Sequence, residues 1–246
     1  MEALAPTAEQ GKLYLIPCPL SENAPMEVLP ITVKQAMESI LHYVVENEKA
    51  ARKFIKNIHP RKPQSELQLF PLNKFTDPVE IQNYLDPIAA GHNMGILSDA
   101  GCPGVADPGA AIVAMAHQKN IEVVPLVGPS SILLSLMASG MNGQSFAFNG
   151  YLPIENHARK RAIKKFEKRS ADFDQTQLFI ETPYRNNQLL KDFLQHLHPE
   201  CQLSVACDLN HPNAFIRTLT VKQWKKVKVD LHKRPAVFSI HFSLAI

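Results

Sequence analysis

The chain has little of what builds disulfide frameworks, metal sites or membrane spans. Its four cysteines are Cys18, Cys102, Cys201 and Cys207. None of them forms a C-x-x-C pair, which argues against a zinc knuckle or a dithiol redox motif and favours free thiols in a reducing cytosol. The ten histidines show no H-E-x-x-H or related spacing, so no metal site is predicted. The most apolar window, residues 123–140, is broken by Pro125, Gly128 and Pro129 and does not predict a membrane span.

A strong charge imbalance is also missing. The 26 basic and 23 acidic residues give a net charge of +3, which permits an acidic partner without requiring one. Residues 1–12 contain no basic region followed by an apolar stretch, so no secretory signal is expected. With 246 residues, 45% of them hydrophobic, the chain can bury one large core or two small ones. We expect a soluble cytoplasmic protein.

Glycine is scarce and unevenly placed. Nine of the ten glycines lie between Gly91 and Gly150, and three of them lie in "SDAGCPGVADPG", residues 98–109. Glycine allows sharp turns and close ligand approach, and open parallel sheets bind ligands beyond the carboxyl ends of their strands. The segment is therefore either a ligand-binding turn or an ordinary strand-to-helix connection. It matches neither the G-x-G-x-x-G fingerprint nor the P-loop.

Apolar runs and helical patterns alternate in the first half of the chain. Runs without polar alternation predict buried parallel strands at 13–16, 43–45, 94–97 and 122–126. Helices are expected at 31–41, 48–57, 78–90 and 109–118. The last helix has Asp107 as its expected N-cap and Pro108 as its first residue. This alternation predicts an α/β layer.

After about residue 128, strands follow one another more directly. One helix is expected to end at Gly140, and two others are expected at 157–169 and 184–197. Strands are expected at 145–151, 177–181, 203–209, 214–220 and 236–242. The sequence therefore predicts two α/β domains: residues 1–126 with a mostly parallel sheet, and residues 127–246 with a mixed sheet.

Polar groups stand at the ends of several predicted elements. Ser130 and Ser131 open a helix, where hydroxyls and free amides either hold polar ligand atoms or simply cap the helix. Glu181 and Asp208 each follow a buried strand, either as site groups or as caps and ion-pair partners. Both alternatives remain open for each residue.

Together these segments resemble the tetrapyrrole methylase superfamily of S-adenosylmethionine-dependent methyltransferases. Within it, they match the ribosomal RNA small-subunit methyltransferase I family. That family's pattern runs S-D-A-G-T-P-x-I-S-D-P-G, V-V-P-L-P-G-P-S/C, G-F-L-P and F-Y-E-A-P-H-R. The chain has "SDAGCP" and "DPG" within 98–109, "VVPLVGPS" at 123–130, "GYLP" at 150–153 and "FIETPYR" at 179–185. The ordered blocks extend over nearly the whole chain.

The resemblance implies two α/β domains with S-adenosylmethionine in a cleft between them, and a homodimer. It implies cofactor contacts from the glycine turn, a helix start and two strand ends. The residues at those positions are Asp99, Ala100, Gly101, Cys102, Pro103, Val105, Ser130, Ser131, Glu181 and Ala206. Cys102 departs from the Asp or Thr that is frequent in this superfamily.

Three segments depart further from the family pattern. P-T-P-I-G-N-L is "PCPLSEN" at 17–23, A-E-D-T-R is "VENEK" at 45–49, and R-E-L-T-K is "CDLNH" at 207–211. The first change removes a glycine and adds Glu22. The second puts Lys49 in place of an arginine and loses the fork geometry of the guanidinium. The resemblance places all three segments on the substrate side, so S-adenosylmethionine binding is better supported than the family's RNA substrate.

Methyl transfer from a sulfonium mainly requires alignment of donor and nucleophile, but a ribose hydroxyl benefits from a general base. The candidates are Asp99, Glu181 and Asp208, with Glu46 behind them, and each is alternatively a cap or an ion-pair partner. Asp99 is the first choice because it follows a strand into the glycine turn.

An RNA substrate requires positive surface. Residues 157–169 carry seven basic side chains, and 222–234 is a second basic stretch; either stretch is alternatively a solvated face. The leading hypothesis is 2′-O-methylation of a 16S ribosomal RNA cytidine, with RNA held by the helix at 157–169. The alternatives are a methyltransferase acting on a small molecule or a protein, and an inactive protein of the same fold that senses S-adenosylmethionine or RNA.

Overall fold

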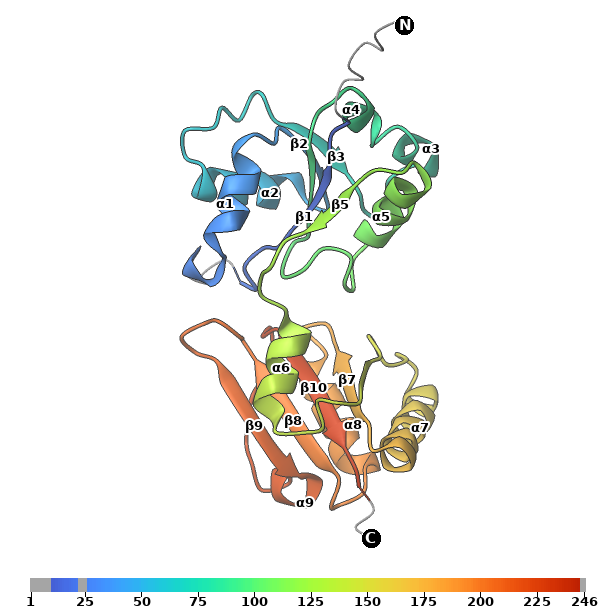
Figure 1. Cartoon of the computed structure of the whole chain (residues 1–246). Coiled ribbons are helices and arrows are strands. Elements are labelled where there is room, and N and C mark those ends of the chain that lie inside the picture. The colour runs from blue at the N-terminus through green and yellow to red at the C-terminus, as the bar shows by residue number, and fades with distance from the viewer. Residues whose placement is uncertain (1–9, 22–25, 244–246) are drawn as a thin grey trace, which may run out of the picture. The chain divides into compact units, whose positions relative to one another are not determined.

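The chain forms two compact units, the first ending at Pro129 and the second beginning at Ser130. The computed structural model describes residues 10–21 and 26–243 (Figure 1). The sequence predicted a boundary between residues 126 and 127. Glu22 and Asn23, two of the departures from the family pattern, and the stretch 1–9 lie outside the described residues.

The first unit is built on a parallel five-stranded sheet in the order β3-β2-β4-β1-β5. Its strands are β1 (Leu13–Ile16), β2 (His42–Val45), β3 (Gln68–Pro71), β4 (Met94–Leu97) and β5 (Val123–Pro125). Four of them were predicted, and β3 was not. The chain leaves β1 toward β2 on one side and leaves β4 toward β5 on the other. Because β1 and β4 are neighbours, their carboxyl ends form a topological switch point, where sheets of this type bind ligands.

Helices cover both faces of this sheet (Figure 1). They are α1 (Ile31–Glu38), α2 (Glu48–Ile58), α3 (Pro78–Ile81), α4 (Asp86–Ala89) and α5 (Gly109–Gln118), with a short 3₁₀ helix η1 (Met26–Val28). Along β2, Tyr43 and Val45 pack in the core under α1 and α2, whereas Val44 packs in the core that includes α5. This alternation is what a strand buried on both faces requires.

The helix predicted at 78–90 is instead two short helices, α3 and α4. Pro87 lies in the first turn of α4. Proline has no backbone N–H to donate, and inside a helix its ring clashes with the carbonyl four residues earlier, here that of Asn83. The segment therefore does not continue as one helix between Ile81 and Asp86.

The second unit contains a mixed five-stranded sheet in the order β6-β7-β10-β8-β9. Its strands are β6 (Phe146–Phe148), β7 (Thr176–Ile180), β8 (Gln202–Cys207), β9 (Phe215–Thr220) and β10 (Ala236–His241). Only the β6–β7 pairing is parallel. The predicted fold class, two α/β units with a parallel first sheet and a mixed second sheet, is confirmed.

Four helices pack on the second sheet: α6 (Ser131–Ser139), α7 (Asn156–Phe173), α8 (Asn186–His196) and α9 (Val221–Trp224). The larger core lies on the face covered by α7, α8 and α9, around Phe179, Trp224 and Phe238. As predicted, α6 ends at Gly140, which has the left-handed φ of +70° that glycine permits.

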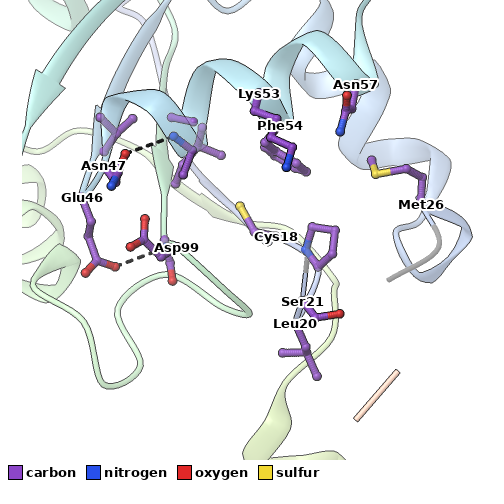
Figure 2. A pocket seen from close by; sticks show the side chains of 16 residues that line it. Cys18, Leu20, Ser21, Met26, Glu46, Asn47, Lys53, Phe54, Asn57 and Asp99 are labelled. Atoms are coloured by element: carbon purple, nitrogen blue, oxygen red, sulfur yellow. Dashed lines mark hydrogen bonds between the residues drawn. The ribbon is translucent and has the colours of Figure 1, made fainter. Parts of the chain in front are cut away.

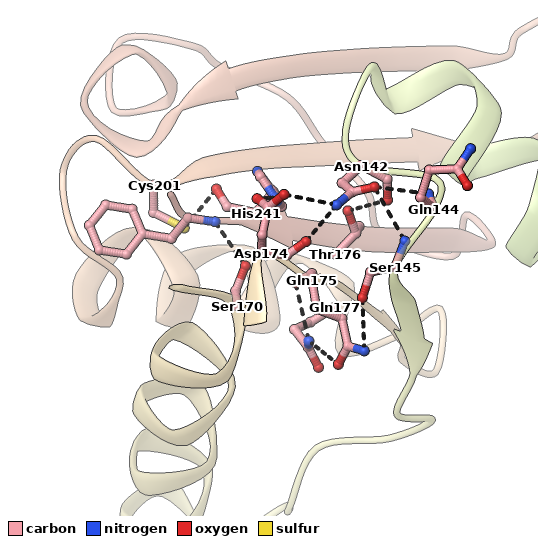
Figure 3. A network of polar contacts seen from close by, with 11 residues as sticks. Asn142, Gln144, Ser145, Ser170, Asp174, Gln175, Thr176, Gln177, Cys201 and His241 are labelled. Carbon is pink, nitrogen blue, oxygen red and sulfur yellow. Dashed lines mark hydrogen bonds and ion pairs between the residues drawn. The ribbon is translucent and has the colours of Figure 1, made fainter. Parts of the chain in front are cut away.

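A polar network joins three segments of the second unit (Figure 3). Asp174, the residue after α7, accepts from the side chain of Asn142 at 3.0 Å and contacts His241 Nε2 at 2.9 Å. Thr176 donates to the backbone oxygen of Asn142 at 2.8 Å. The network therefore ties the turn after α6 to the end of α7 and to the end of β10.

Candidate functional site

Three strand ends of the first unit surround a cavity of about 420 Å³ (Figure 2). The segment after β1 contributes residues 18–21, β2 is followed by Glu46 and Asn47, and β4 is followed by Ser98 and Asp99. One face of α2 and Met26 complete the walls. The cavity therefore lies at the switch point between β1 and β4, where its fold is expected to bind a ligand.

The glycine segment is fixed to the end of β1. Cys18 and Gly101 exchange two backbone hydrogen bonds, of 2.9 and 3.0 Å. Gly101 has φ +77°, which a residue with a side chain rarely adopts. The hydroxyl of Ser98 accepts from the N–H of Ala100 at 3.2 Å and contacts its carbonyl at 2.9 Å. The segment is thus an ordered turn, and it holds Asp99 at the mouth of the cavity.

The second half of the turn is organised by Asp107. Its Oδ1 accepts from the N–H of Gly104 at 2.7 Å and from the N–H of Gly109 at 2.8 Å. The predicted capping role is correct in kind and α5 has the expected bounds, Gly109–Gln118, but Pro108 rather than Asp107 occupies the cap position. The other carboxylate oxygen, Oδ2, is buried and has no hydrogen-bond partner among the described residues.

Glu46 and Asp99 form a pair of carboxylates at this edge of the sheet. Glu46 Oε1 accepts from the backbone N–H of Asp99 at 3.4 Å. Burial raises the pKa of Asp99. The pKa of Glu46 is also raised, first by burial and then by the charges of Asp99 and Asp107, although the hydrogen bond from Asp99 opposes the shift. A carboxylate with a raised pKa is a stronger base than an exposed one.

The thiol of Cys18 lines the same cavity (Figure 2). Burial and the charges of Asp99, Asp107 and Glu46 raise its pKa, so the sulfur stays protonated at neutral pH. Since the thiolate is the nucleophilic form of cysteine, Cys18 is a wall of the cavity rather than a reactive group.

Glu181 and Asp208, the other two base candidates, are held by arginines in the second unit. Glu181 accepts from Arg185 Nη2 at 2.6 Å and from the N–H of Thr182 at 2.6 Å. Asp208 accepts from Arg234 Nε at 2.7 Å. In each pair the guanidinium occupies one oxygen of the carboxylate through a charge-assisted hydrogen bond. This geometry favours the ion-pair role over proton transfer for both residues.

The remaining expected cofactor contacts differ in how much surface they offer. Ala100 is exposed, as is Val105 with 48% of its surface, whereas Gly101 and Pro103 are buried. Cys102 is half-buried, and its thiol donates to the carbonyl of Pro129 at 3.4 Å.

In the second unit, Ser130 caps α6 by accepting from the N–H of Leu133 at 3.4 Å, and Ser131 is the first residue of that helix. The capping alternative therefore describes Ser130. Ala206 offers no exposed side chain for the expected contact, which stays a prediction. This residue is 1% exposed, and it is paired on both sides, to Val237 of β10 and to Ile216 of β9.

The basic helix predicted at 157–169 is α7, but not all of its cations face solvent. Arg159 is buried and forms an ion pair with Asp192 of α8 at 2.6 Å. It also donates to the carbonyls of Pro153 and Ile154 and to the side chain of Asn156. Arg159 therefore fastens the segment before α7 to α8 and is not part of the solvent-exposed basic surface.

The cavity also has wall residues that sequence reasoning missed. Asn47, Ala50, Phe54 and Asn57 line it from α2. Their spacing of three to four residues places them on one face of that helix. The sequence after Glu46 does show this spacing. However, a helix face that lines a cavity has the same spacing as a helix face that packs in a core, so the spacing alone did not identify the cavity.

Comparison with known proteins places these features in context. No family model matches the chain. The chain is 29% identical over 197 residues to ribosomal RNA small subunit methyltransferase I of Vibrio cholerae, a match that covers 80% of this chain and 64% of that protein. The protein of the same name from Synechocystis is 29% identical over 199 residues, covering 81% of this chain and 67% of the relative. The chain thus spans less than two thirds of the Vibrio protein's length.

Solved structures decide the fold. The methyltransferase CobJ aligns with a TM-score of 0.63 at 15% identity, over 94% of each chain. The chain has the tetrapyrrole methyltransferase fold. Uroporphyrin-III C-methyltransferase from Thermus thermophilus aligns with a TM-score of 0.54 at 16% identity, again over 94% of each chain. The expected resemblance is therefore confirmed, with relatives that are small-subunit ribosomal RNA methyltransferases by sequence and tetrapyrrole methyltransferases by fold.

The described residues were also compared with the requirements of a membrane-spanning helix and of a metal site. In residues 10–21 and 26–243, no helix is long and apolar enough to cross a membrane. The same residues hold no group of three or more His, Cys, Asp and Glu side chains placed to bind a metal ion.

Proposed function

We propose that the protein transfers a methyl group from S-adenosylmethionine to a ribose 2′-hydroxyl of small-subunit ribosomal RNA, at a cytidine. The observation that carries the proposal is the pair Asp99 and Glu46 at a switch-point cavity, in a chain whose relatives bear the name ribosomal RNA small subunit methyltransferase I. The proposal places the protein in the cytoplasm, where ribosomal subunits occur.

The first unit offers a surface that fits S-adenosylmethionine. At Gly104, which has φ +80°, no atom lies within 4 Å of the position that a Cβ would take. Gly104, exposed Ala100 and exposed Val105 thus present open backbone and a small apolar surface to a ligand. The carboxylates of Asp99 and Glu46 supply acceptors for the cofactor's amine and hydroxyl groups, and their negative charge attracts a sulfonium. In this proposal the turn 99–105 holds the cofactor.

Methyl transfer requires few chemical steps from the protein's own residues. When bound, S-adenosylmethionine supplies an electrophilic methyl group whose leaving group is a neutral thioether. The chain's own residues then have to orient the acceptor hydroxyl and remove its proton. We propose that Asp99 takes that proton as the new O–C bond forms. Glu46 holds the turn through the Asp99 N–H and keeps the carboxylate in place.

RNA binding through α7 is part of this proposal, but with fewer residues than the seven basic side chains counted in the sequence. Lys160, Arg161 and Lys165 are exposed and form no ion pair among the described residues. Lys164 and Lys168 instead pair with Glu167 and Asp172, each at 2.8 Å. A surface ion pair is weak and its cation remains available in part, so α7 is expected to contribute mainly through the three unpaired cations.

A homodimer is also proposed, in line with the family resemblance. Leu133 and Met137 lie one turn apart on α6 and are 51% and 77% exposed. Exposed apolar residues four positions apart form a stripe that a partner can cover. We expect Met137→Glu to shift the mass measured by analytical ultracentrifugation from dimer to monomer; a monomeric wild type would contradict the proposal.

A second candidate function is methylation of a small molecule or a protein. It is favoured by the identity of the cavity walls, because Leu20, Ser21 and Asn47 differ from the residues of the family pattern at those positions. A cavity with altered walls suits an altered acceptor.

The test uses methyl-labelled S-adenosylmethionine and the full chain. Purified small ribosomal subunits from a strain lacking the corresponding gene are incubated with protein, and label is counted separately in RNA, protein and small-molecule fractions. Label in RNA supports the leading proposal. Label only in another fraction assigns the second function. Heat release on titration with S-adenosylmethionine but no transfer to any acceptor would support the inactive binding protein.

A further inference from the structure

A second hollow lies in the second unit, beside the edge strand β9. It has a volume of about 570 Å³ and is lined by Arg217, Leu219, Gln223, Lys226, Val227 and Lys228. We call it the β9 groove. Leu219 and Val227 pack against the core of the second unit, so its floor is apolar. Its polar lining consists of three cations and one amide.

The strand and helix that form the groove are well anchored. β9 is the last strand of its sheet and pairs only with β8, with Arg217 opposite Val205. Side chains of alternate residues share a face of a strand, and Phe215 and Leu219 pack in the core that contains Trp224. Arg217 is therefore on the α9 face of the sheet.

The helix α9 is fixed at both ends of its single turn. Thr220 and Gln223 form a reciprocal capping box at its start. The indole of Trp224 donates to the carbonyl of Leu203 in β8 at 2.7 Å. The segment 226–228 that follows is therefore held against the sheet, and its lysines occupy defined positions beside Arg217.

The cations of the β9 groove are not neutralised. No acidic residue lines the groove, and in the described part of the chain Arg217, Lys226 and Lys228 form no ion pair or side-chain hydrogen bond. Lys222 nearby is 4.0 Å from Glu200. The contrast with α7 is clear, because three cations of that helix, Arg159, Lys164 and Lys168, pair with carboxylates. Unpaired positive charge thus gathers in the groove.

We propose that the β9 groove binds the phosphate backbone of single-stranded RNA, in addition to the surface of α7. Three cations at one groove match successive phosphates, and the floor of Leu219 and Val227 accepts a ribose or base face, as in other single-strand sites. Backbone contacts of this kind position an RNA without reading its sequence. The inference rests on the proposed RNA substrate and adds the surface that holds it.

The test measures binding of a fluorescein-labelled oligouridylate by fluorescence anisotropy across a series of KCl concentrations. The variant Arg217→Gln/Lys226→Gln/Lys228→Gln is compared with Lys56→Gln/Lys74→Gln/Lys191→Gln, which removes the same charge from exposed lysines outside both basic stretches. For single strands each lost phosphate contact lowers the slope of log affinity against log salt by about 0.7. We expect the groove variant to lose about 2 from that slope and about tenfold or more in affinity. The control variant should keep the wild-type slope.

Equal slopes for the two variants would overturn the inference, as would a wild type that does not bind the oligonucleotide. The single variant Lys228→Gln, expected to lose about 0.7 from the slope, serves if the triple variant does not fold. Failure of the proposed function gives a different result. If RNA binding depends on the groove but no methyl group is transferred to RNA, the proposed function is contradicted and the RNA-binding role of the groove is supported.

Discussion

Glu46 Oε1 accepts a hydrogen bond from the backbone N–H of Asp99, and this contact joins the ends of two neighbouring strands 53 positions apart in the sequence. It places two carboxylates on one cavity and gives them different tasks. Glu46 uses one oxygen to hold the turn, whereas Asp99 takes part through its backbone N–H and does not use its carboxylate in this contact; both residues lie at the cavity (Figure 2).

Replacing Asp99 by Asn is expected to remove the base while keeping the size of the side chain. Loss of a general base costs about 10²- to 10⁴-fold in rate. Because the Asp99 carboxylate also attracts the sulfonium in this proposal, the affinity for S-adenosylmethionine is measured by calorimetry and the rates are compared at saturating cofactor. The measurement is the single-turnover rate of methyl transfer to RNA. Glu46→Gln is the matched control, because its amide oxygen still accepts from the Asp99 N–H, and it should lose much less. Equal losses in the two variants would contradict the assignment.

The pH dependence of methyl transfer follows from the partial desolvation of Asp99, which is an exposed residue but lines the cavity. The base acts only when ionised, and this desolvation raises its pKa above the ordinary value of 3.8. Activity should therefore fall as the pH drops through that raised pKa, giving an acid limb at higher pH than a fully solvated aspartate would give. Rate against pH at saturating cofactor measures the limb. An acid limb that disappears in Glu46→Gln would identify Glu46, not Asp99, as the base.

The buried ion pair between Arg159 and Asp192 is expected to matter for stability. Asp192→Asn leaves the Arg159 guanidinium buried without its counter-charge, which costs about 3–5 kcal/mol. Asp172→Asn is the control, because Asp172 pairs with Lys168 on the surface and such pairs contribute about 0.3–0.5 kcal/mol. Urea unfolding followed by circular dichroism compares the two. Similar losses in both variants would show that the burial of Arg159 carries no special cost.

Gly95 is expected to resist any side chain. A Cβ at this position in β4 would lie 2.6 Å from Ile16 and 2.8 Å from the ring of Tyr43. Gly95→Ala should therefore destabilise the first unit by about 1–3 kcal/mol through overpacking. At Gly143, no atom lies within 4 Å of the position that a Cβ would take, so Gly143→Ala should leave the melting temperature nearly unchanged. Thermal unfolding of both variants measures the difference. A Gly95→Ala variant with the melting temperature of Gly143→Ala would show that the side chains of Ile16 and Tyr43 move to accommodate the added Cβ.

Regular elements were predictable where sequence signals were local. The strands of the first unit at 13–16 and 94–97 and the helix at 109–118 have the predicted bounds, because apolar runs, Asp107 and Pro108 mark them within the chain. β3 was missed because it is short, only half-buried and ends in Pro71, so no apolar run or alternation distinguishes it from the loop before it.

The site was less predictable, since its features depend on partners far away in the sequence. Asp99 was found because it follows a strand, but its contact with Glu46 depends on the order of strands in the sheet. Arg159 belongs to a run of charges, and only its spacing of four residues from buried Ile163 indicates that it faces inward. The ion pair of Asp208 was unpredictable for the same reason, because its partner Arg234 lies 26 positions away.

The central claim is tested most directly by mass spectrometry of nucleosides from small-subunit ribosomal RNA that was incubated with the protein and S-adenosylmethionine. We predict 2′-O-methylcytidine with the wild type and almost none with Asp99→Asn. RNA that gains no methylated ribose, under conditions where the protein binds S-adenosylmethionine, would contradict the claim.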